Sequence, residues 1–237
     1  MWCEIVLDYF DNKKEYRRRD IVDCLRNIKG GLSKSAYDWS INQMLANGEL
    51  IKLGYDLYSL PCEVNKKVYS PVYSRLALEL IESISKHFPL VKFTVFETVL
   101  LNEFLNHLVG NNTIFIQVEK ESSAFVFHYL KDAGFNNVMY KPSLRDFDLY
   151  WTKDCVVVND LISESPISLN TPHYIAIEKI VVDMLADRLV GTTYQRAEFL
   201  DVLNKIQDNY LLDKTRMLRY ASRRNKKVEL LEYLKGE

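Results

Sequence analysis

Polar side chains that can form hydrogen bonds with DNA bases lie on one side of a short amphipathic segment in the first quarter of the 237-residue chain. Opposite the apolar side of this segment lie Ser35, Trp39, Asn42, Gln43 and Ala46. Asparagine and glutamine can each make two hydrogen bonds to an adenine edge in the major groove, and serine contacts base edges less selectively. The segment therefore predicts contact with duplex DNA. Trp39 is the exception, because its large ring needs cover from DNA, from the second domain, or from the core if the helix is rotated.

A capped helix is predicted to hold these side chains. Its apolar side repeats at steps of three and four residues, the spacing of one helix face, through Tyr37, Ile41, Met44 and Leu45. Ser33 is a favourable N-cap residue, because its hydroxyl can accept a hydrogen bond from an N–H group of the first turn. Asn47-Gly48 predicts the end of the helix, since this pair favours a left-handed C-terminal cap.

A hairpin is predicted directly after this helix. Two short apolar runs, Leu50–Leu53 and Leu57–Leu60, are joined by Gly54-Tyr55-Asp56. A helix followed by such a hairpin is typical of the recognition helix and wing of a winged helix-turn-helix, which binds duplex DNA or, as the alternative, docks on proteins. Three further residues are expected to contact DNA at the start of the helix and at the turn: Ser33, Lys34 and Tyr55.

A cluster of cations stands before this arrangement. Lys13, Lys14, Arg17, Arg18 and Arg19 occupy the entrance to a helix predicted over Arg19–Ile28, which follows a first helix over about residues 2–11. Cations at this entrance can contact the phosphate backbone, which sets affinity and register rather than sequence choice. Arg17, Arg18 and Arg19 are our candidates for this contact. A solvated turn is the alternative, because four acids dilute the cluster: Asp11, Glu15, Asp20 and Asp23.

The pattern changes after a polar linker at about residues 62–70. An amphipathic helix is predicted over Pro71–His87, and strands at Phe93–Phe96, Thr113–Val118, Asn137–Tyr140 and Cys155–Asn159. Further helices are predicted from the first strand to about His107, at Ser122–Ala133, and near residues 173–190, 194–209, 213–221 and 223–235. The predicted fold class is α+β: a winged helix-turn-helix over residues 1–62, then an α/β domain over residues 71–237 with a mixed sheet and a helical C-terminus.

One carboxylate of the second domain falls on an apolar helix face. Glu178 lies in the middle of the face formed by Tyr174, Ile177, Val181, Val182, Leu185 and Leu189. Lys179, Asp183 and Asp187 stack instead on a polar face at four-residue spacing. Burying a carboxylate alone is costly, so Glu178 is expected to be neutralised or paired. A structural ion pair with an arginine of the segment Lys214–Lys227, which contains no acid, is favoured over a catalytic role.

The same segment carries a stripe of guanidinium groups. Arg216, Arg219 and Arg223 recur at steps of three and four residues, and Arg224 lies beside them. Paired N–H donors of this kind suit phosphates and carboxylates. The stripe is expected to engage RNA, a nucleotide or an acidic protein surface; the alternative is a solvated face with one arginine turned toward Glu178.

Templates for enzymes fit the chain poorly. It contains no GxxxxGK[ST], GxSxG or HExxH motif. Gln117-Val118-Glu119-Lys120 places valine where a restriction nuclease needs an acid, and no Gly-Ser pair precedes the DxD-like Asp146-Phe147-Asp148. The histidines are dispersed and the cysteines form no CxxC pair. We therefore expect no catalytic site, no metal and no cofactor, and a DNA-directed nuclease stays the alternative from another class.

Composition limits the setting and the partners. The formal net charge of −1 excludes a generally basic nucleic-acid coat, so DNA contact needs a local patch. Scattered cysteines indicate a reducing cytoplasm. The first residues lack the features of a signal peptide, and no apolar run approaches the length of a membrane span. The sequence leaves the oligomeric state open.

Three segments together resemble a known family: GELIKLGYDLYSL, then SESPISLNTPHYIAIEKIVVDMLAD, then RYASRRNKKVELLEYL. In this order they are similar to the AbiEi-type antitoxins of bacterial abortive-infection (type IV toxin–antitoxin) systems. The resemblance implies a repressor that binds inverted repeats in the promoter of its own operon. It also implies a second domain that antagonises a nucleotidyltransferase toxin, typically without a stable complex.

The resemblance extends to individual residues. Within its motifs the matching positions are Glu178, Lys179, Asp183, Tyr220, Arg223 and Arg224. The wing turn departs from the pattern, because such proteins often have Gly-Arg-Gly where this chain has Gly54-Tyr55-Asp56. The turn thus lacks the arginine that would contact the minor groove or phosphate. A transcriptional regulator with a sensor domain is a further alternative.

Overall fold

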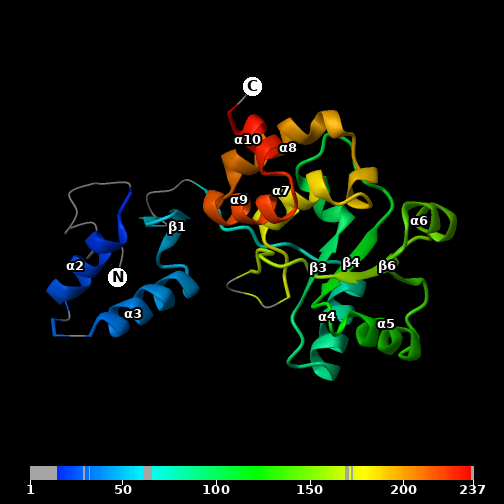
Figure 1. Ribbon diagram of the computed structural model, residues 1–237, viewed down its shortest axis with the longest axis horizontal. Helices are drawn as coiled ribbons and strands as arrows, with labels where there is room; N and C mark the ends of the chain where they lie inside the picture. Colours follow the sequence, from blue (N-terminus) through cyan, green and yellow to red (C-terminus); the bar gives the residue numbers. More distant parts are fainter. Residues whose placement is uncertain are drawn as a thin grey trace. The chain divides into compact units, whose positions relative to one another are not determined.

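The computed structural model describes residues 15–28, 30–31, 33–60, 66–168, 171 and 173–235. The chain divides into two compact units, of which the first comprises residues 1–68 with Gln207–Arg216 and the second comprises residues 69–206 with 217–237 (Figure 1). The helix predicted over residues 2–11, Lys13, Lys14 and part of the linker lie outside the described residues.

Among its described residues before position 61, the first unit contains two helices followed by a hairpin. Helix α2 (Arg18–Ile28) precedes α3 (Lys34–Ala46), and β1 (Ile51–Gly54) pairs antiparallel with β2 (Leu57–Ser59). Helix α3 begins as predicted, because the Ser33 side chain accepts a hydrogen bond from the Ala36 N–H group. It ends before Gly48, whose φ of 70° turns the chain toward β1.

The core of the first unit is formed by both helices and the hairpin. Its buried members are Tyr16, Ile21, Cys24, Leu25, Tyr37, Ile41, Met44, Leu50, Tyr58 and Leu60, with Leu45 packed against them. The predicted apolar side of α3 is therefore the buried side. Tyr16 extends the small sheet, because its backbone exchanges two hydrogen bonds of 2.8 Å with Tyr58.

A segment from the last quarter of the chain completes this unit. Lys67 donates its N–H to the Asn209 carbonyl and accepts from the Leu211 N–H, each at 2.9 Å. Farther along the segment, the Thr215 hydroxyl accepts a hydrogen bond of 3.1 Å from the Tyr55 N–H in the hairpin turn. Residues 207–216 thus fix the backbone of that turn.

The second unit is built on a four-stranded mixed sheet in the order β3-β4-β6-β5. Its strands are β3 (Phe93–Glu97), β4 (Thr113–Val118), β5 (Val138–Tyr140) and β6 (Cys155–Asp160). Strand β3 is antiparallel to β4, whereas β4, β6 and β5 are parallel. The prediction of a mixed sheet is confirmed. Strands β3 and β4 are buried along their whole length and β6 over its first four residues, as expected for strands rich in valine, isoleucine and phenylalanine.

Helices cover both sides of this sheet. Helix α4 (Arg75–His87) and α5 (Ser123–Asp132) lie on one side, where Ser83 and Tyr129 share a hydrogen bond of 3.0 Å (Figure 1). Helix α7 (Ile177–Ala186) lies on the other side. The C-terminal helices are α8 (Phe199–Asn209), α9 (Lys214–Arg223) and α10 (Lys227–Lys235), which confirms a helical end of the chain. No helix within the described ranges is long and apolar enough to cross a membrane.

Two elements of the second unit differ in kind from the sequence-based prediction. The predicted helix before His107 is only a 3₁₀ segment, Thr98–Glu103, because polar side chains nearby bind backbone groups instead. Asn102, for example, accepts from the Val109 N–H at 2.6 Å and donates to the Val109 carbonyl. An additional helix, α6 (Leu144–Tyr150), starts at a capping box in which Ser143 and Asp146 bind each other's backbone N–H groups.

Helix α7 is shorter than predicted and is buried on every side. Tyr174 and Ile175 precede it in isolated β-bridges, so the helix starts at Ile177. At its end Asp187 accepts hydrogen bonds from the Leu189 and Val190 N–H groups. All residues from Ile177 to Leu185 are buried, including those of the polar face. That face therefore lies inside the unit.

Candidate functional site

The exposed face of α3 consists of Ser35, Trp39, Asn42, Gln43 and Ala46. All five side chains are solvent-exposed, and Trp39 is 65% exposed. The alternative of a rotated helix with Trp39 in the core is therefore wrong. The buried Tyr37, Ile41 and Met44 hold the opposite side, so the polar face has a fixed orientation within the unit.

The N-terminus of α3 adds polar groups to this face. The Ser33 hydroxyl serves as the cap, at 3.3 Å from the Ala36 nitrogen, and lies 3.0 Å from the Ser35 hydroxyl. Lys34 is exposed. Hydroxyl groups, an ammonium group and the N–H groups of a helix start together suit a phosphate.

The three arginines predicted to contact the DNA backbone, at the start of α2, differ in their contacts. The guanidinium of Arg18 forms an ion pair with Asp38, so it links α2 to α3. Arg17 is exposed, and the Arg19 side chain is 89% exposed and 3.9 Å from the Asp23 carboxylate. Arg17 and Arg19 thus face solvent, whereas Arg18 is committed to a contact inside the unit.

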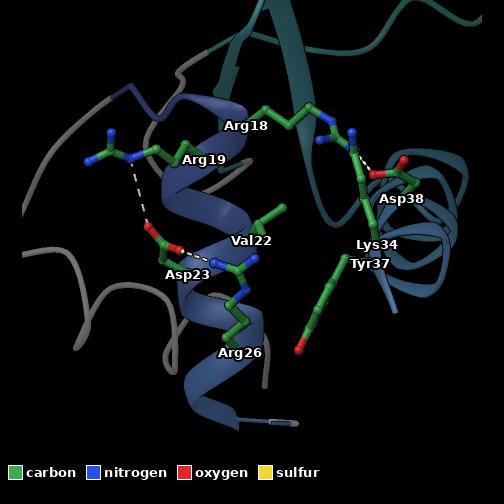
Figure 2. Close-up of a pocket in the computed structure, with 8 residues that line it drawn as sticks. All are labelled: Arg18, Arg19, Val22, Asp23, Arg26, Lys34, Tyr37 and Asp38. Carbon is green, nitrogen blue, oxygen red and sulfur yellow. Dashed lines mark hydrogen bonds and ion pairs between the residues drawn. The ribbon is translucent and has the colours of Figure 1, made fainter. Parts of the chain in front are cut away.

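A cleft of about 290 Å³ lies between α2 and α3 (Figure 2). Its lining residues are Arg18, Arg19, Val22, Asp23, Arg26, Lys34, Tyr37 and Asp38. Arg26 was not selected from the sequence, although it follows Arg19 after two helical turns. Its guanidinium lies 3.2 Å from Asp23 and 5.8 Å from the centre of the Tyr37 ring.

The hairpin turn presents one aromatic side chain to solvent. Tyr55 is 88% exposed. The neighbouring Asp56 has a φ of 52°, and its carboxylate accepts a hydrogen bond of 3.0 Å from the N–H of Arg18 at the start of α2. The carboxylate thus satisfies a helix N–H group that has no partner within the helix. This contact gives the aspartate a structural role at the turn.

A buried polar cluster joins α7 to α9 in the second unit. The Lys179 ammonium lies 2.6 Å from Asp183 Oδ2 and 3.0 Å from the Tyr220 hydroxyl, which donates to Asp183 Oδ1 at 2.8 Å. Burial lowers the pKa of Lys179 although Asp183 opposes this shift. Burial, and then Asp183, raises the pKa of Tyr220. Each of the three groups bonds to the other two, as expected of polar groups removed from water.

Three further side chains border this cluster. Arg224 lies 4.0 Å from Asp183 and 3.8 Å from Asp187, so it is the arginine of its segment that reaches the acids of α7. Burial and the neighbouring Asp183 raise the pKa of Asp187. Gln117 of β4 donates to Asp183 at 3.4 Å. Glu178 is also buried, at 7% exposure.

The arginine stripe is partly engaged by a turn of the second unit. Arg219 forms an ion pair of 2.7 Å with Glu164, and Arg223 Nε donates to the Ser163 hydroxyl at 2.6 Å. Both arginines remain largely exposed. Arg216 belongs to the first unit, where its N–H donates to Asp213 at 3.0 Å. The stripe predicted as one surface is thus shared between two units.

A family model matches residues 36–237, from the first turn of α3 to the last residue. The chain belongs to DUF6577, a family of unknown function. The match includes the hairpin, the mixed sheet and the buried Lys179–Asp183–Tyr220 cluster of this DUF6577 member. No curated protein matches the chain.

The α3 face and the α2–α3 cleft of this DUF6577 member offer groups for recognition by hydrogen bonds and charge. Among the residues that the structure describes, no three histidine, cysteine, aspartate or glutamate side chains are placed to hold a metal ion. The Lys179 ammonium is fully buried and the Asp183 carboxylate nearly so. The polar groups of the α3 face and of the α2–α3 cleft, by contrast, are accessible to solvent and to large ligands.

Proposed function

We propose that this DUF6577 member binds duplex DNA sequence-specifically, with α3 placed in the major groove. The observation that carries the proposal is the exposed α3 face, where Ser35, Asn42 and Gln43 share one side of a 13-residue helix. An α-helix fits the major groove of B-DNA, and asparagine and glutamine can contact an adenine edge through two hydrogen bonds. The buried opposite side of the helix fixes these donors and acceptors before DNA arrives.

The β1–β2 hairpin is proposed to act as the wing of a winged helix. The order α2, α3, hairpin supports this assignment, and Tyr55 at the turn offers an exposed ring for packing on the DNA backbone. Thr215 holds the turn through the Tyr55 N–H. Because the turn carries no arginine, we expect the wing to add little charge-dependent affinity.

The resemblance to AbiEi-type antitoxins supports a more specific role. Under this role the protein represses its own operon by binding inverted repeats in the promoter, and the second unit opposes a nucleotidyltransferase toxin in the cytoplasm. The buried Lys179, Asp183 and Tyr220 would then maintain the fold of the second unit. Its exposed arginines, Arg219 and Arg223, would face the toxin pathway.

The test is binding of the full chain to its own promoter and to a scrambled duplex of the same composition, followed by fluorescence anisotropy. Replacing Asn42 and Gln43 by alanine should reduce discrimination between the two duplexes by roughly 1–3 kcal/mol for each lost two-hydrogen-bond contact. The matched control is Asn204→Ala, an exposed asparagine of α8. Equal affinity of the unmodified chain for both duplexes would refute the proposal.

A further inference from the structure

Four cations and two carboxylates line the cleft between α2 and α3, an excess of two positive charges (Figure 2). Arg18 and Asp38 form a one-to-one ion pair, so the excess rests on the other three cations. Of these, Lys34 forms no ion pair with any described residue. The excess positive charge of the cleft thus belongs to Arg19, Arg26 and Lys34.

One carboxylate is the ion-pair partner of two of these cations. Asp23 lies 3.2 Å from Arg26 Nη1 through Oδ1 and 3.9 Å from Arg19 Nε through Oδ2. Both arginine side chains are mostly solvent-exposed, at 89% for Arg19 and 62% for Arg26. Exposed ion pairs of this kind contribute little to stability, so a stronger acceptor can replace the carboxylate at small cost. Phosphate is such an acceptor, because guanidinium groups bind it through paired N–H donors.

The cleft lies beside the proposed base-contacting residues. Lys34, Asp38 and Asn42 follow one another at four-residue steps, so they form one stripe along α3. Lys34 and Asp38 line the cleft, and Asn42 continues their stripe on the exposed face. A ligand held by Lys34 would therefore sit next to whatever Asn42 contacts.

We propose that the α2–α3 cleft is a binding site for one phosphate group, held by Arg26 of α2 and Lys34 of α3. The ion pair between Arg18 and Asp38 forms a fixed wall of this site. The inference rests on the proposed function, under which the group is a phosphodiester of the DNA backbone next to the base that Asn42 contacts. A free phosphate offers the same chemistry, and the test separates the two sources.

The first arm measures the salt dependence of promoter binding by the full chain. Arg26→Gln and Lys34→Gln should each weaken binding to promoter and scrambled duplex alike and reduce the slope of log K against log[salt] by about 0.9. Asp23→Asn removes the competing carboxylate and should tighten binding to both duplexes. Lys86→Gln, on the exposed surface of α4 in the second unit, is the control and should leave the slope unchanged.

The second arm replaces backbone phosphates of the promoter, one at a time, by uncharged methylphosphonates. In each bound site, the replacement at one phosphate should weaken DNA binding by the unmodified chain. The same replacement should not change DNA binding by the Arg26→Gln variant, because that variant has already lost the contact. If no position behaves in this way and the variants keep the full salt slope, the phosphate site is refuted. The proposed function would still stand if Asn42 and Gln43 control discrimination.

The third arm titrates inorganic phosphate against the full chain without DNA, at constant ionic strength, by calorimetry. Under the backbone assignment, phosphate binds weakly and competes with duplex. A different result is that Arg26→Gln and Lys34→Gln weaken the binding of inorganic phosphate, while the chain binds none of the duplexes. In that case the cleft is a site for a free phosphate and the proposed function fails. Absence of both phosphate and duplex binding would overturn the cleft assignment as well.

Discussion

The ammonium nitrogen of Lys179 lies 2.6 Å from Oδ2 of Asp183, and the two side chains are 0% and 3% exposed. Both residues belong to α7, one helical turn apart. Tyr220 of α9 bonds to each of them, so the pair is satisfied from a second helix. Removing charges from water is costly, and only close pairing with further hydrogen bonds offsets that cost. The cluster therefore ties α7 to α9 only while all three members are present.

Replacing one partner of this ion pair should destabilise the protein strongly. Lys179→Met leaves a buried carboxylate without its ammonium, and Asp183→Asn leaves a buried ammonium without its carboxylate. We expect each change to lower the free energy of unfolding by about 3–5 kcal/mol. The double change Lys179→Met with Asp183→Leu should cost less than the sum, because no lone charge remains. Urea-induced unfolding measures the free energy of unfolding of the two single variants and of the double variant.

An exposed pair with the same spacing provides the control. Arg75 and Glu79 of α4 are also four residues apart and 2.8 Å apart, but their side chains are 93% and 49% exposed. Arg75→Met should cost less than about 1 kcal/mol. Equal losses for Arg75→Met and Lys179→Met would contradict a special role for the buried pair.

Asp56 is expected to stabilise the first unit through α2. Its carboxylate accepts the Arg18 N–H at 3.0 Å, and its φ of 52° lies in the left-handed region. Asp56→Ala should cost about 0.5–2 kcal/mol for the lost cap and about 1 kcal/mol more for backbone strain. Asp56→Asn should cost less, because asparagine tolerates this backbone and keeps an acceptor oxygen. Thermal unfolding followed by circular dichroism distinguishes them, and equal losses would argue against the cap.

The protein should lose stability in alkali because buried tyrosines resist ionisation. Burial raises the pKa of Tyr194 to about 12, and it is also the main cause of the raised pKa values of Tyr58, Tyr73 and Tyr220. Unfolded tyrosines ionise near pH 10, so above this pH the folded state holds more protons than the unfolded state. The free energy of unfolding should therefore fall as the pH rises from about 10 toward the folded pKa values.

The measurement is the unfolding midpoint in urea at pH 8, 10 and 11, with phenolate absorbance as a second signal. Each buried tyrosine adds at most about 1.4 kcal/mol per pH unit to the loss. Tyr194→Phe removes one group, together with its hydrogen bond of 2.7 Å to the Met184 carbonyl. This variant should start less stable and lose less between pH 10 and 11. An unchanged pH dependence would exclude Tyr194 as a contributor.

The sequence predicted α3 well because its two faces differ in polarity at helical spacing. Tyr37, Ile41 and Met44 are buried, and Asn42 and Gln43 are exposed, as their positions require. The strands of the second unit were equally visible, since β-branched and aromatic residues cluster in short runs. Local patterns of this kind are set by residues that are neighbours in the chain.

The remaining features depend on contacts between distant residues. Lys179 and Asp183 at four-residue spacing look like a solvated pair, but the packing of distant residues, Tyr220 among them, makes that face interior. The role of Asp56 requires Arg18, which lies 38 residues away in the sequence. Arg26 becomes part of a cleft only when α3 packs beside α2. No periodicity in one segment carries this information.

The exposed arginines of α9 provide the test of toxin antagonism. Arg219 pairs with Glu164, and Arg223 donates to Ser163, yet both guanidinium groups stay accessible for carboxylates or phosphates. Under the proposed antitoxin role, Arg219→Gln with Arg223→Gln should abolish rescue from a nucleotidyltransferase toxin while promoter binding stays intact. Exposed ion pairs contribute little, so the unfolding temperature should change little. Arg75→Gln is the matched control, since Arg75 forms a similar surface pair with Glu79. Full rescue by a folded double variant would show that these arginines only bind the turn at residues 163–164, and would contradict their proposed role in toxin antagonism.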